Sequence, residues 1–88
     1  MKTTNTFVFS TFAEKKFRRM ERIAQEHVRL KLRGLRNHEH VDSVLKRLTN
    51  FDPATHRLRV GQYRLILQRI SDHEFLVLDI GNRSEIYR

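Results

Sequence analysis

Hydrophobic and polar residues alternate most regularly in the stretch HRLRVGQYR, from His56 to Arg64. An alternation with a period of two is typical of a β-strand with one buried face. It is interrupted at Gly61-Gln62, and a glycine at the first central position is what a type II′ turn requires, because that position has a positive φ. The pattern therefore predicts a β-hairpin with a two-residue loop, in which Arg59 lies opposite Arg64.

This register divides the side chains of the hairpin between two faces. The apolar face consists of Leu58, Val60, Tyr63, Leu65 and Leu67. The other face carries Arg57, Arg59 and Arg64. Like charges that lie directly opposite each other cost at least a few tenths of a kcal/mol, roughly, and a bound phosphate would relieve this repulsion. The alternative is that these are three solvated arginines whose aliphatic stems cover apolar surface.

The first third of the chain predicts a strand and two helices. A short strand is expected at residues 6–10, and Thr11 with Glu14 fits a capping box that begins a helix. The apolar stripe of this helix consists of Phe12, Ala13, Phe17 and Met20. A second helix is expected from Glu21 or Arg22 to about Leu35. Its buried face recurs at Ala24, Val28, Leu32 and Leu35.

The rest of the chain predicts a loop followed by strands. Residues 37–56 are expected to be loop-like with a short helical turn, and residues 52–54 form a turn before the hairpin. Strands are expected at 63–70 and at 74–80, where Leu76, Leu78 and Ile80 would extend the core face. Gly81-Asn82 would end the last strand. The order β-α-α-β-β-β predicts an α+β fold, in which a helical hairpin packs on one face of a mainly antiparallel sheet. Residues 1–88 are expected to form a single domain.

Charge is the composition's strongest feature. Among the 88 residues, 18 are Lys or Arg and 10 are Asp or Glu, which gives a net charge of +8, and 13 of the basic residues are arginines. Such a surface attracts polyanions, so the partner is expected to be a nucleic acid or an acidic protein. The chain has no cysteine, no apolar run that could span a bilayer and no apolar core of a signal peptide. A cytoplasmic location is therefore expected.

The sequence lacks the motifs of common active sites. It has no GxSxG, Walker, zinc-binding or paired-carboxylate motif. His38 and His40 are too few for a metal site, so surface histidines are expected, with no metal and no other cofactor. What remains is a set of four arginines and a tyrosine: Arg57, Arg59, Arg64, Arg83 and Tyr87. Guanidinium groups can stabilise a phosphoryl-transfer transition state, and a phenol beside them could accept the proton of an RNA 2′-hydroxyl. The alternative for Tyr87 is an aromatic that caps the core.

The segments LRVGQYRLILQRI and LVLDIGNRSEIYR resemble the C-terminal half of toxins of the RelE/ParE superfamily, from toxin–antitoxin pairs. The RSEIY tail and the arginine face favour the RelE branch. This resemblance implies a ribosome-dependent endoribonuclease that cleaves mRNA without a metal, by attack of the 2′-hydroxyl on the adjacent phosphate. By motif position, Arg64, Arg83 and Tyr87 match the family's functional residues, and Arg57 and Arg59 match its basic strand positions more loosely.

The resemblance also implies partners: an acidic antitoxin that neutralises the activity and mRNA on the ribosome, with neither a membrane nor a small-molecule cofactor. Lys15, Arg18, Lys46 and Arg47 are the candidate contacts to RNA or the ribosome, although charged residues on the first helix are more simply explained as a solvated face. Asn82 stands where many family members have a histidine, which excludes a histidine base there. Two alternatives remain, a ParE-like inhibitor of DNA gyrase and an inactive toxin-like binding domain.

Overall fold

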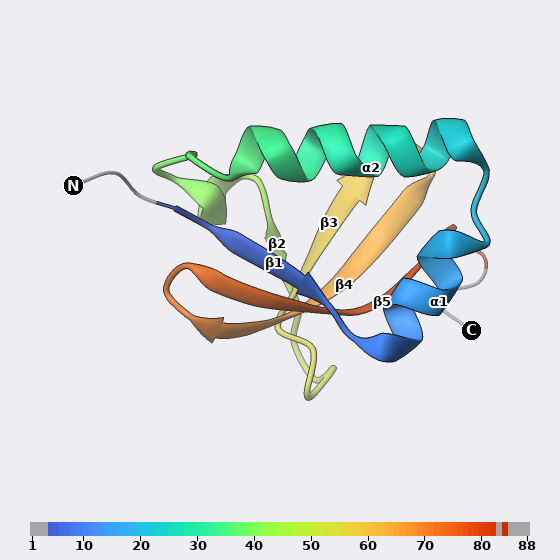
Figure 1. The fold of residues 1–88 in the computed structure, drawn as a ribbon. Helices are drawn as coiled ribbons and strands as arrows, with labels where there is room; N and C mark the ends of the chain where they lie inside the picture. Colours follow the sequence, from blue (N-terminus) through green and yellow to red (C-terminus); the bar gives the residue numbers. More distant parts are fainter. Residues whose placement is uncertain (1–3, 83, 85–88) are drawn as a thin grey trace.

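Five strands form one sheet in the order β1-β5-β4-β3-β2 (Figure 1). The structure is a computed structural model that describes residues 4–82 and 84. Its elements are β1 (Thr6–Phe9), α1 (Thr11–Arg18), α2 (Arg22–Leu35), the 3₁₀ turn η1 (Val41–Ser43), β2 (Lys46–Arg47), β3 (His56–Val60), β4 (Tyr63–Ser71) and β5 (Glu74–Asn82). β1 runs parallel to β5, and the pairs β5-β4, β4-β3 and β3-β2 are antiparallel. The predicted α+β fold is confirmed, with β2 as an additional strand.

The β3–β4 hairpin has the predicted register. Arg59 pairs with Arg64 and Leu58 with Leu65, and Gly61 has the positive φ, 60°, that the turn requires. Leu58 and Leu65 are buried in the core. Since side chains on successive residues point to opposite faces, the arginines lie on the face away from the core, as predicted.

The core lies between the sheet and α2, which runs along one face of the sheet (Figure 1). Three of the four apolar positions predicted for α2 are buried, namely Ala24, Val28 and Leu35. Leu32 packs against the core but is only half-buried, because it lies at the margin of the buried stripe. On the opposite side of the core, the rings of Phe7 and Phe75 stack with their centroids 5.1 Å apart. The 3.6-residue period thus predicted the buried side of this helix.

The start of α1 differs from the prediction by one residue. Ser10, rather than Thr11, is the N-cap: its Oγ accepts a hydrogen bond of 3.1 Å from the Ala13 amide. The Glu14 carboxylate accepts from Arg18 instead of reaching back to the cap. Because Ser10 has an extended backbone at the end of β1, it can bond both to the sheet and to the helix.

α1 lies at the edge of the sheet, beside the part of β5 that β1 does not cover. The Ser10 amide donates to the Val77 carbonyl at 2.9 Å, and this contact fixes the position where the chain leaves the sheet. Ala13 is fully buried, whereas Phe12 is 61% exposed and does not belong to the buried stripe predicted for it. An eight-residue helix at an edge presents only a narrow face to the core, and Phe12 lies outside it.

The core face of β5 also differs from the prediction. Leu76 and Leu78 are only partly buried. The buried apolar residues of this strand are Phe75, Val77 and Ile80. Val77 and Asp79 pair with consecutive residues of β4, so Leu78 is one extra residue, as in a β-bulge. The bulge shifts the alternation of the two faces by one residue. The predicted core face is therefore wrong at Leu76 and Leu78 and correct at Ile80, which follows the bulge.

The segment between α2 and β3 contains more structure than the predicted loop. Its short helical turn is η1, and Lys46–Arg47 form β2, the edge strand that pairs with β3. A two-residue strand of charged residues has no apolar alternation, and the sequence therefore gave no sign of it. Among the described residues, none of the helices has the length and apolarity needed to cross a membrane.

Candidate functional site

A basic groove of about 920 Å³ lies at the loop end of the β3–β4 hairpin. Its described lining residues are Arg57, Arg59, Gly61, Gln62, Arg64, Asn82 and Ser84. None of these is acidic, and three are arginines. The described lining of the groove therefore combines guanidinium groups with amide and hydroxyl groups. Such a lining is suited to binding an anion. We call it the arginine groove.

The sheet register explains why the arginines gather. Arg59, Arg64 and Gly81 lie side by side on β3, β4 and β5. Gly81 was predicted to end the last strand but instead continues it, so the residue beside Arg64 on β5 has no side chain. The strand next to Arg64 therefore adds no side chain of its own at this row of the sheet.

Arg64 differs from a solvated surface arginine because only 9% of it is exposed. Charge–charge interactions are stronger where water is displaced, since water screens them less. A guanidinium held in this way can bind a phosphate in a fixed, bidentate geometry. Burial of Arg64 is therefore an argument against the interpretation of all three arginines as solvated surface residues.

The remaining candidate residues from the sequence are distributed over the molecule. Lys46 pairs with Arg57, so it lies on the same face of the sheet as the arginine groove. Arg47 pairs with His56, faces the other way and lines a different groove. Lys15 and Arg18 lie on α1, and neither lines the arginine groove. Of these four candidate residues, the structure thus places only Lys46 on the face of the sheet that carries the arginine groove.

Two of the predicted residues, Arg83 and Tyr87, lie outside the described residues. Two others that the sequence analysis did not select, Asn82 and Ser84, line the groove, and the Ser84 hydroxyl donates to the Asn82 side-chain oxygen at 2.7 Å. Asn82 was interpreted as the end of a strand, and only its pairing with Tyr63 brings it to the groove. In the sequence, only the resemblance singled out this position, as one where many family members have a histidine.

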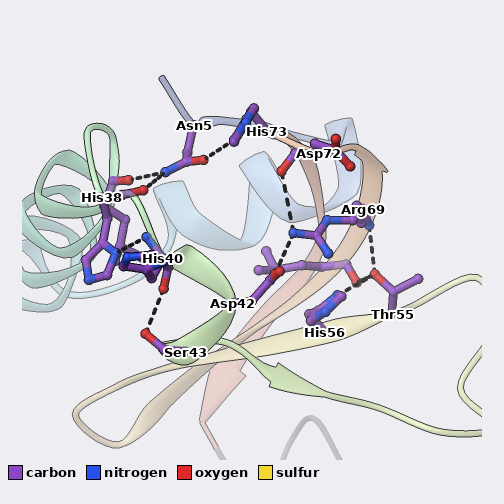
Figure 2. Close-up of polar contacts among 12 residues, drawn as sticks. Asn5, His38, His40, Asp42, Ser43, Thr55, His56, Arg69, Asp72 and His73 are labelled. Atoms are coloured by element: carbon purple, nitrogen blue, oxygen red, sulfur yellow. Dashed lines mark hydrogen bonds and ion pairs between the residues drawn. The ribbon is translucent and has the colours of Figure 1, made fainter. Parts of the chain in front are cut away.

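At the opposite end of the hairpin, Arg69 has defined partners (Figure 2). Its Nη2 forms an ion pair of 2.5 Å with Asp42 Oδ1, and its guanidinium carbon lies 5.1 Å from the centre of the Phe75 ring. Its amide donates to Thr55 Oγ1 at 2.8 Å. Arg69 therefore connects η1 to the sheet.

His56 lies beside this cluster and is buried (Figure 2). Its ring meets the Phe75 ring edge-on, with 6.2 Å between the centroids, and its Nδ1 is 2.9 Å from Thr55 Oγ1. Burial, and secondarily the positive charge of Arg69, lowers the pKa of His56 below its usual value of 6.5. The folded protein therefore favours the neutral imidazole at this position.

The histidines of the loop after α2 form local hydrogen bonds (Figure 2). The His40 amide donates to His38 Nδ1 at 3.0 Å, and the Ser43 hydroxyl donates to the His40 carbonyl at 2.7 Å. Within residues 4–82 and 84, no group of three or more His, Cys, Asp or Glu side chains is arranged to hold a metal ion. The His38 ring thus accepts a hydrogen bond within the loop, whereas His40 takes part through its backbone.

Comparison with solved structures identifies the fold. A chain of the RelBE2 toxin–antitoxin complex from Mycobacterium tuberculosis matches with a TM-score of 0.75 and 22% identity, over 91% of this chain and 99% of that chain. The isolated RelE toxin of E. coli matches with a TM-score of 0.66 and 24% identity, over 94% and 90%. A double arginine-to-alanine mutant of E. coli RelE in the free state gives 0.68 and 20%, over 94% and 87%. No family model and no curated protein matches the sequence.

The similarity extends over most of each chain. The protein therefore has the RelE-like toxin fold of toxin–antitoxin systems. Identities of 20–24% establish the fold alone. The function of the arginine groove depends on its own residues and their chemistry, because one fold can serve several functions.

Proposed function

We propose that this protein is the toxin of a toxin–antitoxin pair and that it inhibits translation as a ribosome-dependent mRNA endoribonuclease. The observation that carries the proposal is the arginine groove on a RelE-like fold, with Arg64 nine-tenths buried at its base. The motif resemblance of the C-terminal half, which contains Arg64, supports the same function. Cleavage would need no metal, because cationic side chains supply the positive charge.

The reaction requires a 2′-hydroxyl. Its oxygen attacks the adjacent phosphorus, the bond from phosphorus to the 5′-oxygen breaks, and a cyclic phosphate and a 5′-hydroxyl are formed. One group must accept the 2′ proton and another must donate a proton to the leaving oxygen. DNA has no 2′-hydroxyl, and this chemistry therefore selects RNA.

Roles follow from charge and motif position. Arg64, with Arg83, would hold the scissile phosphate and stabilise the charge that develops on it. Arg57 and Arg59 would hold the neighbouring phosphates, because their strand lies next to Arg64. Tyr87 would accept the 2′ proton or orient the hydroxyl. Positioning by the ribosome completes the geometry by presenting the message in line for attack.

The antitoxin would be a small acidic protein. The net charge of +8 favours such a partner, and the similar toxin of M. tuberculosis was crystallised in a toxin–antitoxin complex. We expect the antitoxin to bind tightly, with a salt-sensitive component, and to block access to the arginine groove. Both proteins would be cytoplasmic, where the ribosomes are. A complex that leaves Arg64 accessible would contradict the expected mode of inhibition.

The test is translation of a defined message in a purified cell-free system, followed by primer extension. Wild-type protein should produce new RNA ends within the codon in the ribosomal A site, and only when ribosomes are present. Tyr87→Phe removes one hydroxyl, and a loss of at least about 10²-fold in cleavage rate with ribosome binding intact would support proton transfer by Tyr87. Lys31→Gln, on α2, removes a charge far from the groove and serves as the control.

One result would overturn the proposal in favour of a defined alternative. If the message on the ribosome stays intact while the protein inhibits supercoiling by DNA gyrase, the function is that of a ParE-like toxin. If neither message nor gyrase is affected, the fold serves only for binding. The assay with programmed ribosomes and the supercoiling assay therefore need to be run on the same preparation.

A further inference from the structure

An ion pair joins α1 to β5, and neither of its residues is among the described ones that line the arginine groove. Lys16 Nζ, on α1, is 2.7 Å from Asp79 Oδ1, on β5, and the two side chains are 28% and 30% exposed. The same carboxylate oxygen accepts a hydrogen bond of 2.7 Å from the Ile80 amide. The Asp79 carboxylate is thus held from two sides.

The register places Asp79 on the arginine face of the sheet. Asp79 pairs with Ile66, and Ile66 pairs with Arg57, so the three side chains point to the same side. Neighbouring strands are about 4.8 Å apart, and Asp79 is therefore about 10 Å from Arg57 across the sheet. An unpaired carboxylate at this distance would repel a phosphate bound at the arginines.

Lys16 reaches Asp79 because β1 is short. β1 pairs with β5 only as far as Val77, and α1 then takes the place of the missing strand along the rest of β5. The Ser10 hydroxyl and amide, which donate to the carbonyls of Leu78 and Val77, hold the start of α1 in this place. A lysine in the second turn of α1 can therefore extend over the edge of the sheet to the arginine face.

We propose that Lys16 is a positioning residue that neutralises and restrains Asp79, so that the arginine face remains attractive to the phosphates of RNA. This inference rests on the proposed function, since it takes RNA as the ligand of the arginine groove. It assigns to Lys16 an indirect role: the lysine acts on the ligand through the charge of Asp79. It also explains why an acidic residue is tolerated on the same row of the sheet as Arg57.

The role predicts opposite effects for the two partners. Lys16→Met leaves the carboxylate unpaired and should weaken binding of RNA about three- to tenfold. Asp79→Asn removes the repulsive charge and should leave binding equal to wild type or strengthen it about threefold. In the double variant both charges are absent, and binding should return to about that of wild type. A purely structural tether predicts instead that both single variants weaken binding to the same extent.

The measurement is fluorescence anisotropy with a single-stranded 2′-O-methyl RNA, which cannot be cleaved, over a range of salt concentrations. The effect of Lys16→Met should decrease as salt increases, because salt screens the carboxylate. The matched control is Lys31→Met, which removes a lysine of α2. It should weaken RNA binding by the same small factor in the wild type and in the Asp79→Asn variant. Thermal unfolding of each variant identifies any that fail to fold.

Inorganic polyphosphate, tested as a second ligand, separates this inference from the proposed function. If both ligands show the opposite effects but ribosome-bound mRNA stays intact, the role of Lys16 stands and the nuclease proposal fails. If Asp79→Asn weakens binding of both ligands as much as Lys16→Met does, the pair is only a tether and the inference is wrong. If wild type binds neither ligand, the inference is wrong as well.

Discussion

The two ends of the β3–β4 hairpin use arginine in different ways. At one end, Arg69 forms an ion pair with Asp42 and lies over the ring of Phe75, so its charge is used within the fold. At the other end, Arg59 and Arg64 lie directly opposite each other and line an open groove, an arrangement that costs stability.

The difference separates an arginine whose charge is used within the fold from arginines that line a groove. Arg69 stabilises the fold through the carboxylate of Asp42 and the ring of Phe75. Arg59 and Arg64 instead line a groove whose described lining contains three arginines and no acidic residue, which suits an anion. We therefore expect substitution of Arg64, at the groove, to reduce function, and substitution of Arg69, at the other end, to reduce stability.

The largest effect is expected from Arg64→Gln. Loss of a preorganised cation at the scissile phosphate should lower the rate of mRNA cleavage on ribosomes by a factor on the order of 10²–10³. Single-turnover cleavage of a defined message measures it. Thermal unfolding checks that the variant is folded under the conditions of the cleavage assay. A normal cleavage rate for this variant would remove Arg64 from the chemical step.

Arg69→Met tests the other end. It removes the ion pair with Asp42 and the contact with the Phe75 ring, and the expected decrease in the free energy of unfolding is about 1–2 kcal/mol, since both groups are partly exposed to solvent. Denaturant titration measures it. Cleavage by the folded fraction should stay within about twofold of wild type. A loss of cleavage equal to that of Arg64→Gln would show that the two ends do not differ as described.

A smaller effect is expected from the neighbours Lys46 and Arg47, which carry the same charge on opposite faces of β2. Lys46→Gln should weaken RNA binding severalfold and reduce the slope of log affinity against log salt by about 0.7, the value for one contact to a single-stranded phosphate backbone. Arg47→Gln should change neither quantity by a comparable amount, because Arg47 faces away from the arginine groove. Equal effects of the two variants would contradict the assignment of faces.

The smallest effect is a dependence of stability on pH. The pKa of His56 is lowered in the folded protein, so below about pH 6.5 the unfolded chain binds a proton that the folded protein does not. The free energy of unfolding should therefore fall as the pH decreases from about 6.5 toward the lowered pKa of the folded state. His56→Gln should reduce this slope, whereas His27→Gln, on the exposed side of α2, should preserve it. Urea titrations between pH 5 and pH 8, roughly the range in which histidine titrates, measure it.

Local patterns were sufficient for the hairpin and for α2. The turn at Gly61 needs a residue that tolerates a positive φ, and the 3.6-residue period of Val28 and its neighbours defines the buried side of the helix. The arginine face followed directly from the hairpin, since a fixed register determines which residues share a face. Arg57, Arg59 and Arg64 could therefore be grouped before their surroundings were known.

Other features depended on partners distant in the sequence. Leu78 is a bulge residue only because of its register against β4, and β2 exists only because β3 offers it an edge. Gly81 and Asn82 have the composition of a turn, but pairing with β4 keeps them in the strand. For this reason, composition alone did not reveal that Asn82 lines the arginine groove, and only the motif resemblance singled out its position.

By itself the sequence determined the order of the two helices and of the strands other than β2, the hairpin register and the face that carries the arginines, because these properties depend on residues close together in the chain. Only the tertiary structure decided that Arg64 is buried, that Arg69 pairs with Asp42 and that Lys16 reaches Asp79. Both ion pairs join elements that are far apart in the sequence, and the burial of Arg64 depends on the packing of the whole chain. The energy of a charge depends on what surrounds it in space, and that surrounding is set when the chain packs.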